Sequence, residues 1–166
     1  MLNSIITCIK KYMTRRQATS KGNPLVLTAL IVYLLSLIWL LFFYEGQSYS
    51  RLAAGSMRVP NFELFRTVRH YLFVLFQTDH GLPVKANAAI NLLGNSILFV
   101  PMGILVPWVV PAFSKIKFTF LAILGICLIE FLQWMYQIGI FDIDDIFLNV
   151  IGCLTGLFLS QFYKIK

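Results

Sequence analysis

The stretch Phe141–Leu159, FDIDDIFLNVIGCLTGLFL, places three aspartates directly before a long apolar run. Asp142, Asp144 and Asp145, together with Glu130, are four of only seven acidic residues in the chain of 166 residues. The apolar run predicts a helix, and the aspartates lie where that helix would begin. The stretch therefore raises the question of whether this negative charge belongs to a membrane-embedded site or to a loop between two spans.

The predicted helix has one polar face. Asp145 is followed by Asn149, Gly152 and Gly156 at steps of four, three and four, which fall on a single stripe of an α-helix. Two glycines four residues apart also let a neighbouring helix approach closely. The spacing thus directs Asp145 and Asn149 toward another helix rather than toward lipid.

The amino-acid composition indicates an integral membrane protein. The chain is 58% hydrophobic and 13% charged, with a mean hydropathy of +0.77, which is too apolar for an ordinary soluble domain. Crossing a ~30 Å hydrocarbon core takes about 20 apolar residues. Segments suited to this lie at about 25–44, 88–110, 118–137 and 146–162. We therefore predict an all-α, polytopic helix bundle with four transmembrane helices, because lipid leaves open strands without hydrogen-bond partners.

The basic residues predict the orientation and the domain organisation. Residues 1–24, the connection before 118 and the residues after 162 carry nine lysines and arginines and no acidic residue. The positive-inside rule places these parts, and both termini, in the cytoplasm. We divide the chain into a basic amino-terminal segment, 1–24, and a membrane domain, 25–166, with an outer loop at 45–87. The net charge of +7 indicates contact with anionic lipid, and no basic stripe interleaved with aromatic residues suggests a nucleic acid.

The outer loop contains an apolar stretch that is too short to cross the membrane. FELFRTVRHYLFVLFQ, residues 62–77, predicts a helix in the outer interface or a re-entrant piece. Arg66 and Arg69 would then contact lipid headgroups, since cations and phosphates pair well. The alternative is a folded cap over the bundle with solvated cations, and the sequence leaves both open.

Polar residues from three predicted spans fall in the same outer half of the bilayer. Glu130 lies roughly 12 Å from the outer end of its span, at 1.5 Å per residue. An ionisable group there costs about 2.5–3.5 kcal/mol, so partners from other helices are expected. The residues that converge with it are Asn91, Asn95, Gln133, Asp142, Asp145 and Asn149. They predict a ligand-binding or catalytic pocket. The alternative is that they only join helices, with Asp142 or Asp144 capping the last span.

Three blocks of this sequence together resemble the VanZ-like family of small membrane proteins, named for a protein associated with teicoplanin resistance. They are INLLGNSILFVPMGILVP at 90–107, EFLQ at 130–133 and FDIDDIFLNVIGCLTG at 141–156, with RVPNFELFRT at 58–67 as a weaker fourth. The resemblance marks Asn91, Asn95, Glu130, Gln133, Asp142, Asp145, Asn149 and Gly152. The chain departs from the family pattern at Leu64, in place of a proline, and at Ile138–Ile140, where an arginine is expected.

The resemblance implies a bacterial plasma-membrane protein that lowers susceptibility to teicoplanin and related lipoglycopeptides. Its pocket would bind a membrane lipid, a lipid-linked cell-wall precursor or the drug, and an oligomer is compatible with this. No cofactor is expected, apart from a divalent cation that the carboxylates could bridge to phosphate. An alternative is a hydrolase or transferase acting on a lipid headgroup through Glu130 and the aspartates. The sequence disfavours an enzyme, because HExxH, GxSxG and CxxC are absent. A transporter is a third class.

Overall fold

A computed structural model describes residues 23–43, 59–110 and 114–162, and within them the predicted all-α class is confirmed. The helices are α2 Pro24–Phe42, α4 Arg66–Phe76, α5 Leu82–Leu98, α6 Val100–Val109, α7 Lys115–Met135 and α8 Ile143–Leu159. The only β pairing in these residues is an isolated bridge between Asn61 and Asp142. Nearly all of the predicted segment 1–24, residues 45–58 of the outer loop and the last four residues lie outside the described part.

Within the described residues, three helices are long and apolar enough to cross a membrane, namely Pro24–Phe42, Leu82–Val109 and Lys115–Met135. They correspond to the predicted spans at 25–44, 88–110 and 118–137. The helix that contains the second predicted span begins six residues before Ala88, at Leu82. Pro83 fits the first turn of a helix, where its missing N–H costs nothing, and Lys85 lowers the hydropathy of this turn without ending the helix. The predicted fourth span corresponds to α8, which has 17 residues.

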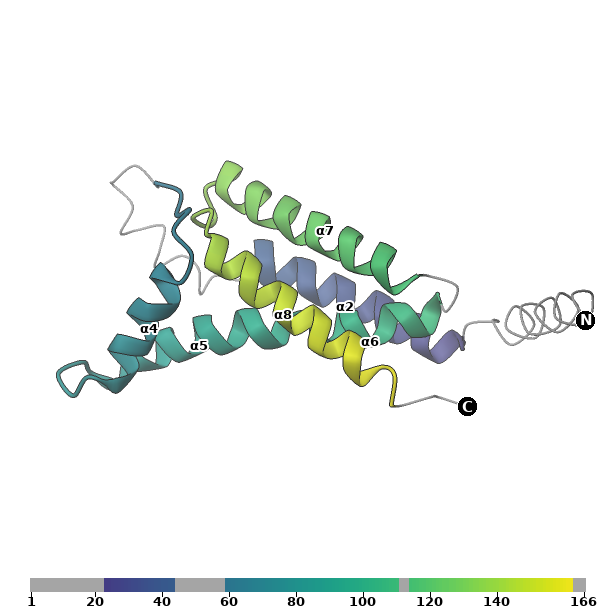
Figure 1. Ribbon diagram of the computed structural model, residues 1–166, viewed down its shortest axis with the longest axis horizontal. Helices are drawn as coiled ribbons and strands as arrows, with labels where there is room; N and C mark the ends of the chain where they lie inside the picture. Colours follow the sequence, from purple (N-terminus) through teal and green to yellow (C-terminus); the bar gives the residue numbers. More distant parts are fainter. Residues whose placement is uncertain (1–22, 44–58, 111–113, 163–166) are drawn as a thin grey trace, which may run out of the picture.

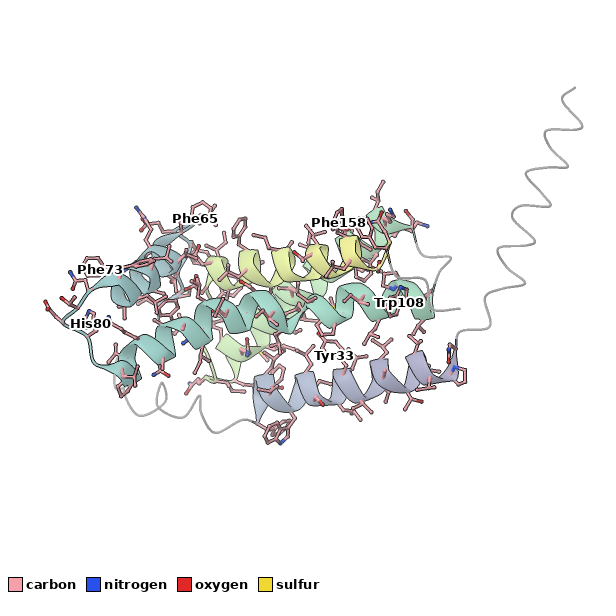
Figure 2. The ribbon with its side chains drawn as sticks, turned by 90° about the horizontal axis from the view of Figure 1, so that it is seen from below. Tyr33, Phe65, Phe73, His80, Trp108 and Phe158 are labelled. Carbon is pink, nitrogen blue, oxygen red and sulfur yellow. The ribbon has the colours of Figure 1, made fainter. Side chains whose placement is uncertain are left out.

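The second of these helices is broken at Phe99, between α5 and α6. Pro101 occupies the first turn of α6, and proline has no N–H with which to continue the hydrogen bonds of α5. At the break, the Tyr33 hydroxyl of α2 donates a hydrogen bond to the Leu98 carbonyl at 2.8 Å. Figure 2 shows Tyr33 on α2. This hydrogen bond joins α2 to the last turn of α5.

Helix α8 is the centre of the bundle, with α5, α6 and α7 packed against it and α2 packed against α6 (Figure 1). Close contact is possible because glycines line the seam. A Cβ added to Gly152 would lie 2.0 Å from the Ser96 carbonyl oxygen, and one added to Gly156 would lie 2.0 Å from that of Val100. Gly103 of α6 meets the backbone of α8 equally closely. The predicted close approach at the two α8 glycines is confirmed.

The predicted helix in the outer loop is also present, as α4. It lies at one end of the molecule beside the start of α5 (Figure 1). A short connection, residues 77–81, reverses the chain between these two helices. Helix α4 therefore contacts the bundle at the same end at which α7 finishes and α8 begins.

Candidate functional site

The first turn of α8 is capped by its own sequence. Asp142 is the N-cap residue, and its carboxylate accepts a hydrogen bond from the Asp144 N–H at 2.9 Å. This satisfies one of the N–H groups that a helix start leaves unpaired. The capping interpretation of Asp142 is therefore confirmed. The same turn is joined to the residues before α4 by two backbone hydrogen bonds. The Asn61 N–H donates to the Phe141 carbonyl at 2.8 Å, and the Ile143 N–H donates to the Asn61 carbonyl at 3.1 Å.

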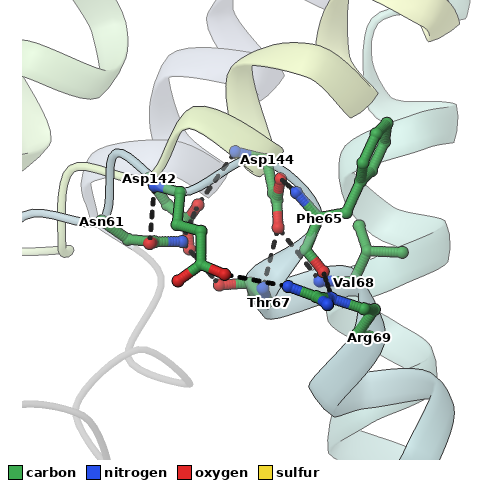
Figure 3. Close-up of polar contacts among 8 residues, drawn as sticks. Asn61, Phe65, Thr67, Val68, Arg69, Asp142 and Asp144 are labelled. Carbon is green, nitrogen blue, oxygen red and sulfur yellow. Dashed lines mark hydrogen bonds and ion pairs between the residues drawn. The ribbon is translucent and has the colours of Figure 1, made fainter.

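Asp142 also binds the side chains of Asn61 and Thr67, which lie before α4 and in its first turn (Figure 3). Asn61 Nδ2 donates to Oδ1 at 2.9 Å, and the Thr67 hydroxyl donates to Oδ2. Both oxygens of this buried carboxylate are thus occupied by hydrogen bonds within the chain.

Asp144 caps a different helix. Its side chain is 0% exposed and accepts hydrogen bonds from three backbone N–H groups at the start of α4 (Figure 3). The donors are Phe65 to Oδ1, and Thr67 at 2.8 Å and Val68 at 3.1 Å to Oδ2. Phe65, at φ 65°, provides no side-chain cap for α4. A carboxylate at a helix N-terminus also interacts favourably with the helix dipole. We call Asp142, Asp144, Asn61 and Thr67 the aspartate latch, because they fasten α4 to α8.

A second polar group lies next to the latch, one step further along α8. Asn95 of α5 donates from Nδ2 to Oδ1 of Asp145, which is half-buried. Within the described residues, no hydrogen bond occupies the other carboxylate oxygen of Asp145. This contact links α5 and α8 at the level at which the sequence analysis placed them together.

Glu130 and Asn149 are the buried residues of this second group that lack partners. Glu130 of α7 is 5% exposed, makes no hydrogen bond to a described residue, and interacts electrostatically most strongly with Asp145 and then with Asp142. Asn149 is 3% exposed and lies one helical turn after Asp145 on the same face of α8. Its Oδ1 is the one fully buried side-chain oxygen or nitrogen without a partner in the described parts. Unpaired buried polar atoms are rare in folded proteins and call for an explanation.

Tyr71 brings α4 to the same place. The pKa of the Tyr71 hydroxyl is raised to about 12. Burial of the side chain is the largest cause, and the nearby carboxylates of Asp145 and Asp142 raise the pKa further. The hydroxyl therefore keeps its proton at neutral pH and remains a hydrogen-bond donor. We call Tyr71, Asn95, Glu130, Asp145 and Asn149 the acid–amide cluster, to which α4, α5, α7 and α8 all contribute.

Several predicted site residues lie outside this cluster. Asn91 is exposed and its amide donates to the Asn87 carbonyl of its own helix at 2.8 Å. Gln133 is buried, and its Nε2 donates to the Leu41 carbonyl in the last turn of α2 at 3.0 Å. It therefore satisfies a helix end, as expected of a residue that joins helices.

The two predicted headgroup cations, Arg66 and Arg69, are exposed. Arg69 forms an ion pair with Glu63 at 2.9 Å, and its Nε donates to the Phe65 carbonyl at 3.1 Å. This is the only ion pair within the described ranges, and both of its side chains are exposed. The cations of the described residues thus leave the acid–amide cluster uncompensated.

The sequence analysis did not assign Asn61, Thr67, Asp144 or Tyr71 to the site. Two of them, Asn61 and Thr67, lie within RVPNFELFRT, the weakest of the four blocks. The position of that block was a usable signal, but its partners lie about 75–81 residues away in sequence. Asp144 bonds only to backbone N–H groups, which leave no trace in residue identity.

The donor set limits the chemistry of the site. In the described parts, no three histidine, cysteine, aspartate or glutamate side chains converge in a way that could hold a metal ion. The divalent cation considered from the sequence gains no support from this geometry. What the acid–amide cluster does offer is a set of buried hydrogen-bond acceptors, with no described cation paired to its carboxyl groups.

Comparison with known proteins places the chain in a family. No curated protein and no solved structure matches it. The family profile described as VanZ/LLP1 matches residues 30–164, which is most of the sequence and includes every residue of the latch and the cluster. The match confirms the resemblance drawn from the four sequence blocks. The chain therefore belongs to the VanZ/LLP1 family.

Proposed function

We propose that this VanZ-like protein lowers bacterial susceptibility to teicoplanin-type lipoglycopeptides by binding a ligand at the acid–amide cluster. The ligand would be a membrane lipid, a lipid-linked wall precursor or the drug itself. Two observations carry the proposal: Glu130 is 5% exposed and has no hydrogen-bond partner among the described residues, and the fully buried Oδ1 of Asn149 has none there either. A bundle that needed polar residues only to join its helices would pair them, as it does with Gln133 and Tyr33.

The proposal places the protein in the plasma membrane with four spans and both termini inside. Helix α8 would be the fourth span, since its 17 residues are apolar after the first turn. At 1.5 Å per residue, α5 and α6 together extend about 42 Å, which exceeds a ~30 Å hydrocarbon core. The start of α5 would then project into the outer interface with α4, and the cluster would lie in the outer leaflet, near lipid headgroups.

The test is a susceptibility measurement in a Gram-positive host that produces the protein. Glu130→Gln should return teicoplanin susceptibility to that of the host alone, while the amount of protein in the membrane stays unchanged. Glu63→Gln is the matched control, because it makes the same chemical change at an exposed glutamate. Full protection by a normally abundant Glu130→Gln variant would refute the proposed site.

A further inference from the structure

We infer that the acid–amide cluster recognises a primary ammonium group. The inference rests on the proposed ligand site and deepens it by naming the chemistry that the ligand must present. It follows from three properties of the cluster within the described residues: its free acceptors, the lack of a cation paired with its carboxyl groups, and its unpaired amide oxygen.

The free groups of the cluster are acceptors contributed by α7 and α8. Among the described residues, Glu130 has two carboxyl oxygens without hydrogen-bond partners, Asp145 has one oxygen beyond the one that Asn95 occupies, and Asn149 has Oδ1. A primary ammonium carries three N–H donors that rotate to suit their partners. It can therefore bond to a glutamate, an aspartate and an amide oxygen together, which a hydroxyl with one donor cannot do.

The charge of the cluster points to a cation. Glu130 is buried near Asp145 and Asp142, and no described lysine or arginine forms an ion pair with any of them. Buried carboxylates are unfavourable unless a positive charge or a proton compensates them. An ammonium group supplies such a positive charge and a neutral donor does not, whereas a metal ion lacks the converging ligands it needs in the described residues.

Asn149 distinguishes between kinds of cation. A quaternary ammonium supplies charge but has no N–H, so Oδ1 of Asn149 would remain buried and unpaired. A primary ammonium satisfies both requirements. The position of Asn149, one turn beyond Asp145 on the same helix face, allows one small group to reach both side chains.

The experiment measures thermal stability of the purified full-length protein with three amphiphiles that share a twelve-carbon chain. These are dodecylammonium, dodecyltrimethylammonium and dodecanol. Dodecylammonium should raise Tm saturably, and the other two should require at least tenfold higher concentrations for the same shift. Equal shifts from all three would overturn the inference.

Variants establish where the ammonium binds. Asn149→Leu and Glu130→Gln should each weaken the dodecylammonium effect at least tenfold, and Glu63→Gln should preserve it. Asn149→Leu should fold without ligand, because the oxygen it removes has no partner, and an unchanged or raised Tm would verify this. An ammonium effect that persists in both site variants would overturn the assignment to this cluster.

Two sources could supply the ammonium, an aminophospholipid or an amine on the drug or precursor. Native mass spectrometry distinguishes them. Retention of phosphatidylethanolamine but not phosphatidylcholine identifies the lipid source. Retention of a lipoglycopeptide with a free amine, but not of the same drug with its amine acetylated, identifies the drug. Retention without regard to the amine would refute the inference.

The two proposals fail separately. If site variants restore drug susceptibility but the three amphiphiles act alike, the proposed function stands and the inference of a primary-ammonium site is refuted. If dodecylammonium binds and the site variants abolish that binding while resistance persists, the ammonium site stands and the proposed function falls.

Discussion

Asp144 shows how a single carboxylate can complete a helix to which it does not belong. Its two oxygens accept the N–H groups of Phe65, Thr67 and Val68 at the start of α4, and it is fully buried there. Phe65 has no side-chain acceptor and adopts a left-handed conformation, so α4 has no local substitute for this cap. Asp144, although it lies in the first turn of α8, thus caps the amino-terminal end of α4.

We expect Asp144→Asn to lower the free energy of unfolding by about 2–4 kcal/mol, since it replaces one acceptor oxygen with a donor and removes the charge. Thermal unfolding of the purified protein measures this. Asp79→Asn is the control at an exposed loop position and should change stability by less than about 0.5 kcal/mol. A stability for Asp144→Asn equal to the control would show that the cap is dispensable.

The sequence allowed the site residues on the faces of the long helices to be proposed, but not those in and before α4. Asn95, Glu130, Asp145 and Asn149 were all recognised, because helical spacing places them on inward faces. Asn91 shares the stripe of Asn95 but lies about 6 Å further toward the start of α5, at 1.5 Å per residue. Since α8 begins only two residues before Asp145, it offers Asn91 no partner at that level.

At the scale of elements, the glycine seam determines how closely α8 approaches α5 and α6. Gly152→Ala and Gly156→Ala each introduce a Cβ 2.0 Å from a backbone carbonyl oxygen, so the helices must separate. We expect each to cost about 1–3 kcal/mol or more, seen as a lower Tm and reduced membrane abundance.

Gly94 and Gly125 are matched controls, because a Cβ added to either helical glycine meets nothing within 4 Å. Replacing them with alanine should be neutral or should stabilise the protein by up to about 1 kcal/mol through helix propensity. If alanine at Gly94 or Gly125 lowered stability as much as alanine at Gly152, the effect at Gly152 could not be attributed to close packing of α8 against its neighbours.

The elements themselves were largely predictable from hydropathy, and the departures have local causes. The second span was predicted to start at Ala88 because Lys85 lowers the hydropathy of the preceding turn, whereas helix formation depends on the backbone and begins at Leu82. Proline interrupts the hydrogen bonds of a helix, and the break falls before Pro101. The contact of Tyr33 with Leu98 at this break could not be predicted, since it joins residues 65 positions apart.

For the whole molecule, the positive-inside rule gives an orientation that labelling can test. In a variant with the native cysteines replaced, Thr78→Cys lies between α4 and α5, and Ser114→Cys lies before α7. A membrane-impermeant maleimide should label Thr78→Cys in intact cells, and Ser114→Cys only after the cells are lysed. The reverse pattern would invert the proposed topology, and labelling of both in intact cells would show that α5 and α6 do not cross.

The latch also orders the biosynthesis of the molecule. Helix α4 has 11 residues, too few to be stable alone in water, and the carboxylate that caps it lies 76–79 residues later in the chain. The ribosome therefore completes α5, α6 and α7 before the acceptor for α4 exists. Helix α4 thus reaches its final form only once α8 has been made.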